Sequence, residues 1–163
     1  MPRQSTDPGL SEHDIEVLQL REEYGWFVMK LKVMEDKDSP AFAYSFGLFE
    51  EFRHPEIMIF GLDLSIMHRL INDVGGQVKM GIRYGDGSIT EELLEGFPCA
   101  FRQVSPLRYR KTCSWATWFY GNLSFPVLQL FWPDKKRKFP WDPGCDESIR
   151  RLQPDLSKPP GPS

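Results

Sequence analysis

The stretch PAFAYSFGLFEEFRHPEIMIFG, residues 40–61, decides the fold because it places two strand patterns on either side of a short charged link. Residues 41–46 and 57–60 have the length and the aromatic or β-branched content of largely buried strands. The link between them carries His54, Pro55 and Glu56 in succession. We therefore expect two neighbouring strands of an antiparallel sheet, joined by a loop that presents polar side chains.

Towards the N-terminus, the pattern is first helical and then alternating. Ser11 and Asp14 resemble a capping box, and the apolar residues that follow predict a helix over residues 11–24 that ends at Gly25. From Trp26 onwards, every second residue is apolar, which predicts a half-buried strand. This strand extends the same sheet.

Towards the C-terminus, two more helices and two more strands are predicted. Residues 63–74 form an amphipathic helix that Gly75 and Gly76 should end, and residues 105–120 form an aromatic-rich helix. Strands are expected at residues 97–104 and 125–132, with turns over residues 81–96. The fold class that follows is α+β, a mainly antiparallel sheet flanked by about three helices.

Length and composition indicate one domain. A chain of 163 residues with 40% hydrophobic content can bury roughly 70% of its unfolded surface in a single core. We expect residues 1–9 to be flexible, residues 10–153 to form the domain, and residues 154–163 to be a disordered proline-rich tail.

Charge and cysteine content narrow the class of protein. A net charge of -3 disfavours nucleic acid and anionic membranes as partners, since their binders present a strongly basic face. Cys99, Cys113 and Cys145 are odd in number and lack CxxC spacing, which argues against disulfides and a zinc site. No signal peptide or membrane span is evident. We expect a cytoplasmic protein without metal or cofactor.

One short segment is strongly basic, although the chain as a whole carries a net negative charge. Lys135, Lys136, Arg137 and Lys138 stand between two aromatic-proline borders in the segment WPDKKRKFPW. Basic residues interleaved with aromatic rings bind single-stranded nucleic acid, but here the charges form one block with the rings outside it. A solvated hairpin tip is the better interpretation.

The collinear motifs of this chain resemble a bacterial family called domain of unknown function 4262. They are FAYSFGLFEEFRHPEIMIFGL, a helix containing LIND, EGFPCAFRQV, WFYG, FPVLQLFWPD, FPWDPG and a final LQP, over about residues 24–156. The resemblance implies no established activity. The basic run lies where family members have a glycine-containing turn, which makes it a feature of this chain rather than of the family.

The candidate binding residues are polar or aromatic side chains within these motifs: His54, Glu56, Gln129, Trp132, Asp134 and Trp141. Residues 54–56 (HPE) and 98–99 (PC) are similar to elements of zinc deaminases, but Arg102 stands where the second cysteine ligand belongs. His68 lies on an apolar helical stripe, where packing is the more common role. No nucleophile motif occurs, so catalytic residues stay unassigned.

Two function hypotheses follow from these observations. The first is a binding or interaction module with a protein or small-molecule partner, and neutralisation of a toxin by an immunity protein is one form of it. The second is a small-molecule hydrolase that uses His54 as base with Glu56 or Asp134 as orienter or acid. A pocket in which His54, Glu56, Gln129 and Asp134 converge would favour chemistry. An open aromatic patch rimmed by charge would favour a protein partner.

Overall fold

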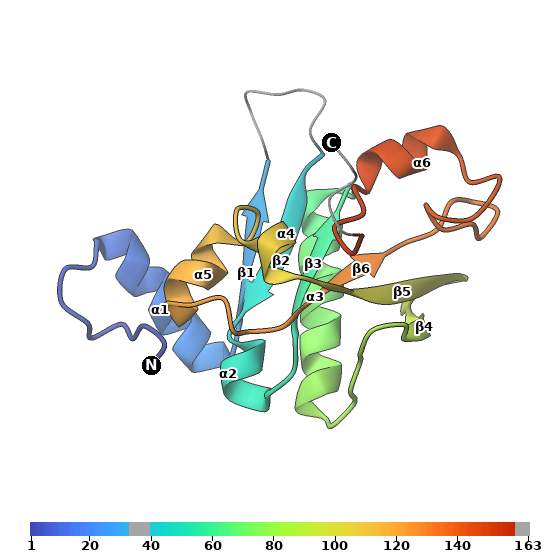
Figure 1. Cartoon of the computed structure of the whole chain (residues 1–163). Helices are drawn as coiled ribbons and strands as arrows, with labels where there is room; N and C mark the ends of the chain where they lie inside the picture. Colours follow the sequence, from blue (N-terminus) through green and yellow to red (C-terminus); the bar gives the residue numbers. More distant parts are fainter. Residues whose placement is uncertain (33–39, 159–163) are drawn as a thin grey trace.

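Six strands form one open, mixed sheet. The computed structural model describes residues 1–32 and 40–158. In spatial order the strands are β1 (Phe27–Leu31), β2 (Phe42–Phe46), β3 (Glu56–Phe60), β6 (Val127–Phe131), β5 (Phe97–Val104) and β4 (Ile89–Leu94) (Figure 1). Among the strand pairs of these residues, β3 and β6 pair in parallel and the other four pairs are antiparallel. The predicted α+β class is confirmed.

In the described part of the chain, six helices accompany the sheet: α1 (Glu12–Tyr24), α2 (Leu48–Phe52), α3 (Leu64–Lys79), α4 (Pro106–Tyr109), α5 (Ser114–Tyr120) and α6 (Glu147–Leu152). The capping box of α1 is confirmed, since Ser11 accepts from the backbone N–H of Asp14 and the Asp14 carboxylate accepts from that of Ser11. The helix predicted over residues 105–120 is wrong as one element, because residues 110–113 separate α4 from α5.

Helices cover both faces of the sheet. Successive strand residues point to opposite faces, so Ile57 and Ile59 of β3 pack in the cluster that contains α3. Met58 and Phe60 pack in a second cluster, together with α1 and α5. Figure 1 shows the result as three layers. This double cover explains why all five residues of β3 are buried.

The helix α3 does not end at Gly75 and Gly76, as predicted, but continues to Lys79. Its last turn buries Val78 in the core, which outweighs the low helix propensity of glycine. Gly75 also has a packing role. A Cβ atom there would lie 2.5 Å from two ring atoms of Trp26, so only glycine lets that indole lie against the helix.

The turn predicted over residues 81–96 is also wrong in part, because β4 occupies its second half. This strand has polar residues and a register irregularity between Thr90 and Leu94, and only β5 pairs with it among the described residues. Because it is an edge strand, one side of it stays in solvent, and its sequence ITEELL lacks the apolar alternation that identifies a strand.

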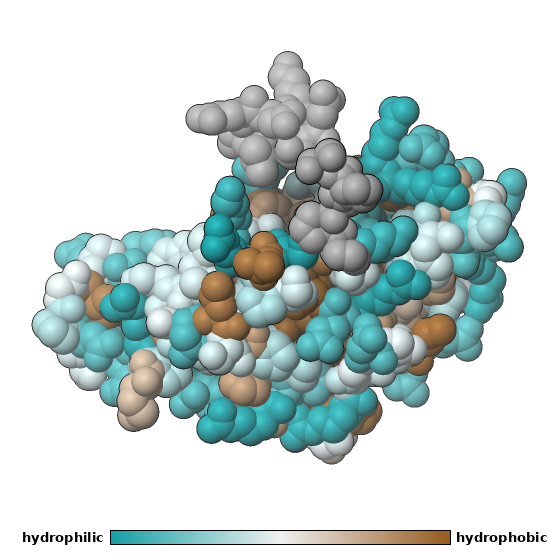
Figure 2. All heavy atoms as spheres, in the orientation of Figure 1, coloured by the Kyte–Doolittle hydropathy of each residue, from teal (hydrophilic) through white to brown (hydrophobic). Residues whose placement is uncertain are grey.

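Residues near each end of the described chain contact the domain. In the segment predicted to be flexible, the Arg3 backbone N–H donates to the Phe119 carbonyl oxygen at 2.8 Å. In the segment predicted to be a tail, Leu156 packs with the cluster of α1 and α5. The domain boundaries themselves stay a prediction. Figure 2 shows the surface in the orientation of Figure 1, with hydrophobic residues gathered over the middle of this face and hydrophilic residues around them.

Candidate functional site

The Glu56 side chain is enclosed by hydrogen-bond donors at the start of α2. Its Oε1 accepts from the Ser45 hydroxyl at 2.8 Å and the Leu48 N–H at 3.2 Å. Its Oε2 accepts from the N–H groups of Gly47 at 3.0 Å and Phe49 at 3.1 Å. The Tyr120 hydroxyl also donates to Oε2. The carboxylate thus satisfies three backbone N–H groups at the helix start.

This cluster is closed to solvent. Glu56 is 1% exposed. Burial raises the pKa of its carboxyl, and hydrogen bonds from Tyr120, Phe49, Ser45 and Gly47 act in the opposite direction. With five donors already on its two oxygens, the carboxylate has no position left for a ligand. Its geometry is that of a clamp between β3, the β2–α2 turn and α5.

His54 lies on a separate part of the fold. Its Nδ1 lies 2.9 Å from the Pro55 carbonyl oxygen, and its Nε2 accepts from the Tyr84 backbone N–H at 3.0 Å. The imidazole is therefore neutral and carries its hydrogen on Nδ1. Burial lowers the pKa of His54, and the charge of Arg83 acts in the same direction. Both ring nitrogens are occupied, which links the start of β3 to the segment after α3.

Gln129 and Trp132 hold the C-terminal segment against the sheet. The Gln129 amide donates to the Pro154 carbonyl oxygen at 2.7 Å and accepts from the Leu156 N–H at 2.9 Å. The Trp132 backbone and the Gln153 side chain exchange two hydrogen bonds, at 3.0 and 2.8 Å. The Gln129 side-chain amide thus has the hydrogen-bond partners that a buried amide inside a strand requires.

Asp134 organises the basic run. Its carboxylate accepts from the backbone N–H groups of Lys136 and Lys138 at 2.9 Å each, and of Asp146 at 3.1 Å. These bonds hold the pKa of Asp134 below its usual range, and the bond from the Lys138 N–H has the largest effect. The four basic side chains are exposed on this turn, but no described strand follows to make the predicted hairpin.

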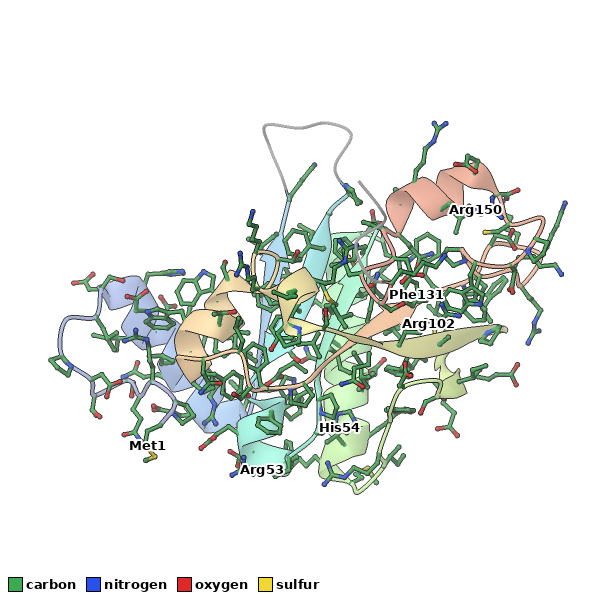
Figure 3. The ribbon with its side chains drawn as sticks, in the orientation of Figure 1. Met1, Arg53, His54, Arg102, Phe131 and Arg150 are labelled. Carbon is green, nitrogen blue, oxygen red and sulfur yellow. The ribbon has the colours of Figure 1, made fainter. Side chains whose placement is uncertain are left out.

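Trp141 packs beside this turn, with its ring stacked on Phe139 and edge-on to Phe131. The Arg102 guanidinium lies 3.5 Å from the centroid of the Trp141 ring. Figure 3 shows Arg102 and Phe131 close together on one side of the sheet and His54 near one end of α3. The six predicted residues therefore make separate contacts and do not meet in one pocket. Their binding role stays a prediction.

A different set of residues lines an open groove of about 600 Å³ at the β1 edge of the sheet. Residues of β1 line the middle of the groove, and residues of α1 and α3 line its two sides. It is lined by Leu20, Tyr24, Trp26, Phe27, Val28, Lys30, His68, Asn72 and Lys79. Tyr24 is 62% exposed, and Trp26 and Phe27 are half-buried.

The apolar floor of this β1 groove is fixed in place. The Trp26 indole N–H donates to the Asn72 side-chain oxygen at 2.9 Å, and its ring lies against Gly75. Lys30 and Lys79 are exposed at the margin. Burial lowers the pKa of His68, and the positive charge of Lys30 lowers it further. The groove combines aromatic surface with a positively charged margin.

Comparison with protein families identifies most of the chain. The family model described as Domain of unknown function (DUF4262) matches residues 21–146. The chain belongs to this family. All six predicted residues and every groove residue except Leu20 lie inside the matched part of this DUF4262 protein. No curated protein and no solved structure shows a significant match.

The DUF4262 fold shows the β1 groove where sequence reasoning found only packing. His68 was assigned to the core because it lies on the α3 stripe, yet it is half-buried at the margin of the groove. The cluster of aromatic residues Tyr24, Trp26 and Phe27 at the junction of helix and strand was a sequence signal, since aromatic residues are enriched at binding interfaces.

The described residues of the DUF4262 chain contain neither a cluster of metal-binding side chains nor a membrane-spanning helix. No three His, Cys, Asp or Glu side chains there come together as a metal site would require. None of the described helices is long and apolar enough to cross a membrane.

Proposed function

We propose that this DUF4262 protein is a binding module whose partner occupies the β1 groove. The observation that carries the proposal is the combination, in one open groove, of Tyr24, Trp26 and Phe27 with the cations Lys30 and Lys79. Aromatic side chains are enriched at binding interfaces because they bury a large area at low entropic cost. The positive margin favours a partner that carries negative charge beside apolar groups.

The hydrolase hypothesis has weaker support. A general base needs a free nitrogen or oxygen within reach of substrate, but both ring nitrogens of His54 already have partners in the fold. The oxygens of Glu56 and Asp134 are engaged with backbone N–H groups. Binding uses side chains that the structure leaves accessible, whereas this hydrolysis would need side chains that it encloses.

The binding proposal is tested with 8-anilinonaphthalene-1-sulfonate, a dye that joins an aromatic body to an anionic group. We expect saturable binding, with a fluorescence increase and a weakened affinity in Tyr24→Ala and in Lys30→Glu. Leu107→Ala is the matched control, because Leu107 is an exposed apolar residue on α4, outside the groove. Dye binding that is insensitive to both groove variants, or absent from the folded protein, would contradict the proposal.

A further inference from the structure

The groove has a backbone edge at its centre. The strand β1 is the first in the sheet order, and among the described residues only β2 pairs with it. In an antiparallel sheet, alternate residues point their N–H and C=O groups at each neighbour, so about two or three of the five β1 residues present both groups outward. Such a row of unpaired groups can take another strand.

Helices on both faces extend to this edge. Leu20 and Tyr24 of α1 line the groove from one face of the sheet, and His68, Asn72 and Lys79 of α3 line it from the other. The distance along α3 from His68 to Lys79 is about 16 Å at the usual helical rise. An extended segment covers that distance with about five residues. The length of the groove therefore matches the length of β1.

The opposite edge of the sheet has different properties. The outer strand β4 carries exposed acidic residues, its register with β5 is irregular, and Glu91 forms an ion pair with Arg137. Acidic side chains and an irregular register are features by which edge strands avoid pairing. The β1 edge, in the described residues, combines a regular register with apolar walls.

Charge selects the occupant of the β1 edge. Lys30, Lys32 and Lys79 are exposed there, and none of them belongs to an ion pair among the described residues. A second copy of the chain would bring the same lysines to the same edge, and like charges close together oppose pairing. A segment with acidic side chains would pair with them instead.

We propose that the partner is an acidic, partly apolar protein segment that adds to β1 as a seventh strand. This inference rests on the proposed binding function and names its ligand class. Backbone hydrogen bonds to β1 fix the register, and alternate side chains of the segment point to opposite faces. Apolar side chains contact Tyr24 on the α1 face, while carboxylates approach Lys30 and Lys79 on the α3 face.

The probe is the capped heptapeptide acetyl-Glu-Val-Glu-Phe-Glu-Val-Glu-amide, with affinity measured by calorimetry. We expect binding to the wild type, and a loss of at least about tenfold for Lys30→Glu because a rim charge then repels the ligand. Lys111→Glu is the matched control, since Lys111 is an exposed lysine outside the groove. The same peptide with lysine in place of glutamate should not bind.

Strand addition is separated from simple charge attraction by N-methylation of the probe. Two peptides are compared, one methylated at the N–H groups of its odd-numbered residues and one at those of its even-numbered residues. One pattern should abolish binding and the other should leave it nearly unchanged, because only one set of N–H groups faces β1. Amide hydrogen exchange should show new protection at alternate residues of β1. Equal effects of both methylation patterns, or preference for the lysine peptide, would overturn the proposal.

Two other outcomes also have a defined meaning. If the dye binds in the groove but the acidic heptapeptide does not, the binding function stands and the strand-addition inference is wrong. If sedimentation shows a dimer that Tyr24→Ala dissociates, the occupant is a second copy of the chain, and the acidic-partner inference is again wrong. Each result concerns the intact protein and leaves the two proposals distinguishable.

Discussion

Replacement of Glu56 by glutamine tests whether its role is to hold the fold together. Glu56→Gln keeps the size of the side chain but turns one acceptor oxygen into an amide that donates. The site offers three backbone N–H groups and two hydroxyls to the two carboxylate oxygens. Backbone N–H groups can only donate, so the new amide must face at least one of them.

The size of the effect follows from these contacts. The smaller loss arises if the amide takes the place of Oε1, because the Leu48 N–H then has no acceptor, at a cost of about 1–3 kcal/mol. The bonds to the remaining oxygen lose their charge assistance, roughly 1 kcal/mol for each. We expect a total loss of about 4–6 kcal/mol in the free energy of unfolding. For a domain of this length that corresponds to a decrease in Tm of about 8–24 °C.

The assay is chemical denaturation at pH 7, followed by circular dichroism, with thermal unfolding alongside. Glu50→Gln is the matched control, because Glu50 is exposed on α2, whose first N–H groups bind Glu56, and its replacement should change stability by less than about 0.5 kcal/mol. A loss below about 1 kcal/mol for Glu56→Gln would refute the clamp, since unpaired buried donors cost at least that much. It would also return Glu56 to the list of candidate binding residues.

Three further predictions concern separate parts of the molecule. Gly75→Ala should lower the free energy of unfolding by about 1–3 kcal/mol, because its Cβ would overlap the Trp26 ring. Gly76→Ala should raise the free energy of unfolding by about 0.5–1 kcal/mol in the same denaturation experiment, because its Cβ would meet no atom within 4 Å. His68 should titrate by NMR below the ordinary histidine pKa of about 6.5, and Lys30→Ala should raise that pKa; an unchanged midpoint would contradict the predicted coupling. Substitution of serine for Lys135, Lys136 and Lys138 should change the unfolding free energy by less than about 0.5 kcal/mol each, and tight binding of single-stranded nucleic acid by the wild type would contradict the solvated-turn interpretation.

Local patterns were sufficient for most elements of the fold. Helix α1 was predicted from its capping box and Gly25, since both signals act within a few residues. Strands β3, β5 and β6 were predicted from short apolar runs, because burial on both faces leaves little room for polar residues. The amphipathic stripe of α3 identified its buried face, although its length was misjudged.

The errors have a common physical origin in tertiary contacts. Gly75 looks like a helix stop until Trp26, 49 positions earlier in the chain, is seen to lie against it. The strand β4 exists because β5 pairs with it, and its own residues have weak strand propensity. His54 and Glu56 looked like a functional pair because they stand two residues apart in the chain. Pairing partners from α5 and from the segment after α3 give each a separate structural contact.

The β1 groove could not be predicted from local patterns because its existence depends on strand order. The sequence indicates that residues 27–31 form a strand, but any strand of a sheet can lie at its centre or its edge. The parallel pairing of β3 with β6 brings the C-terminal strands to one side of the sheet, and this leaves β1 without a second neighbour among the described residues. The role of Lys30 and Lys32 depends on this edge position, which their spacing in the sequence does not reveal. Inside a sheet they would be unpaired charges in the core, and at the edge they decide by charge which strand can join it.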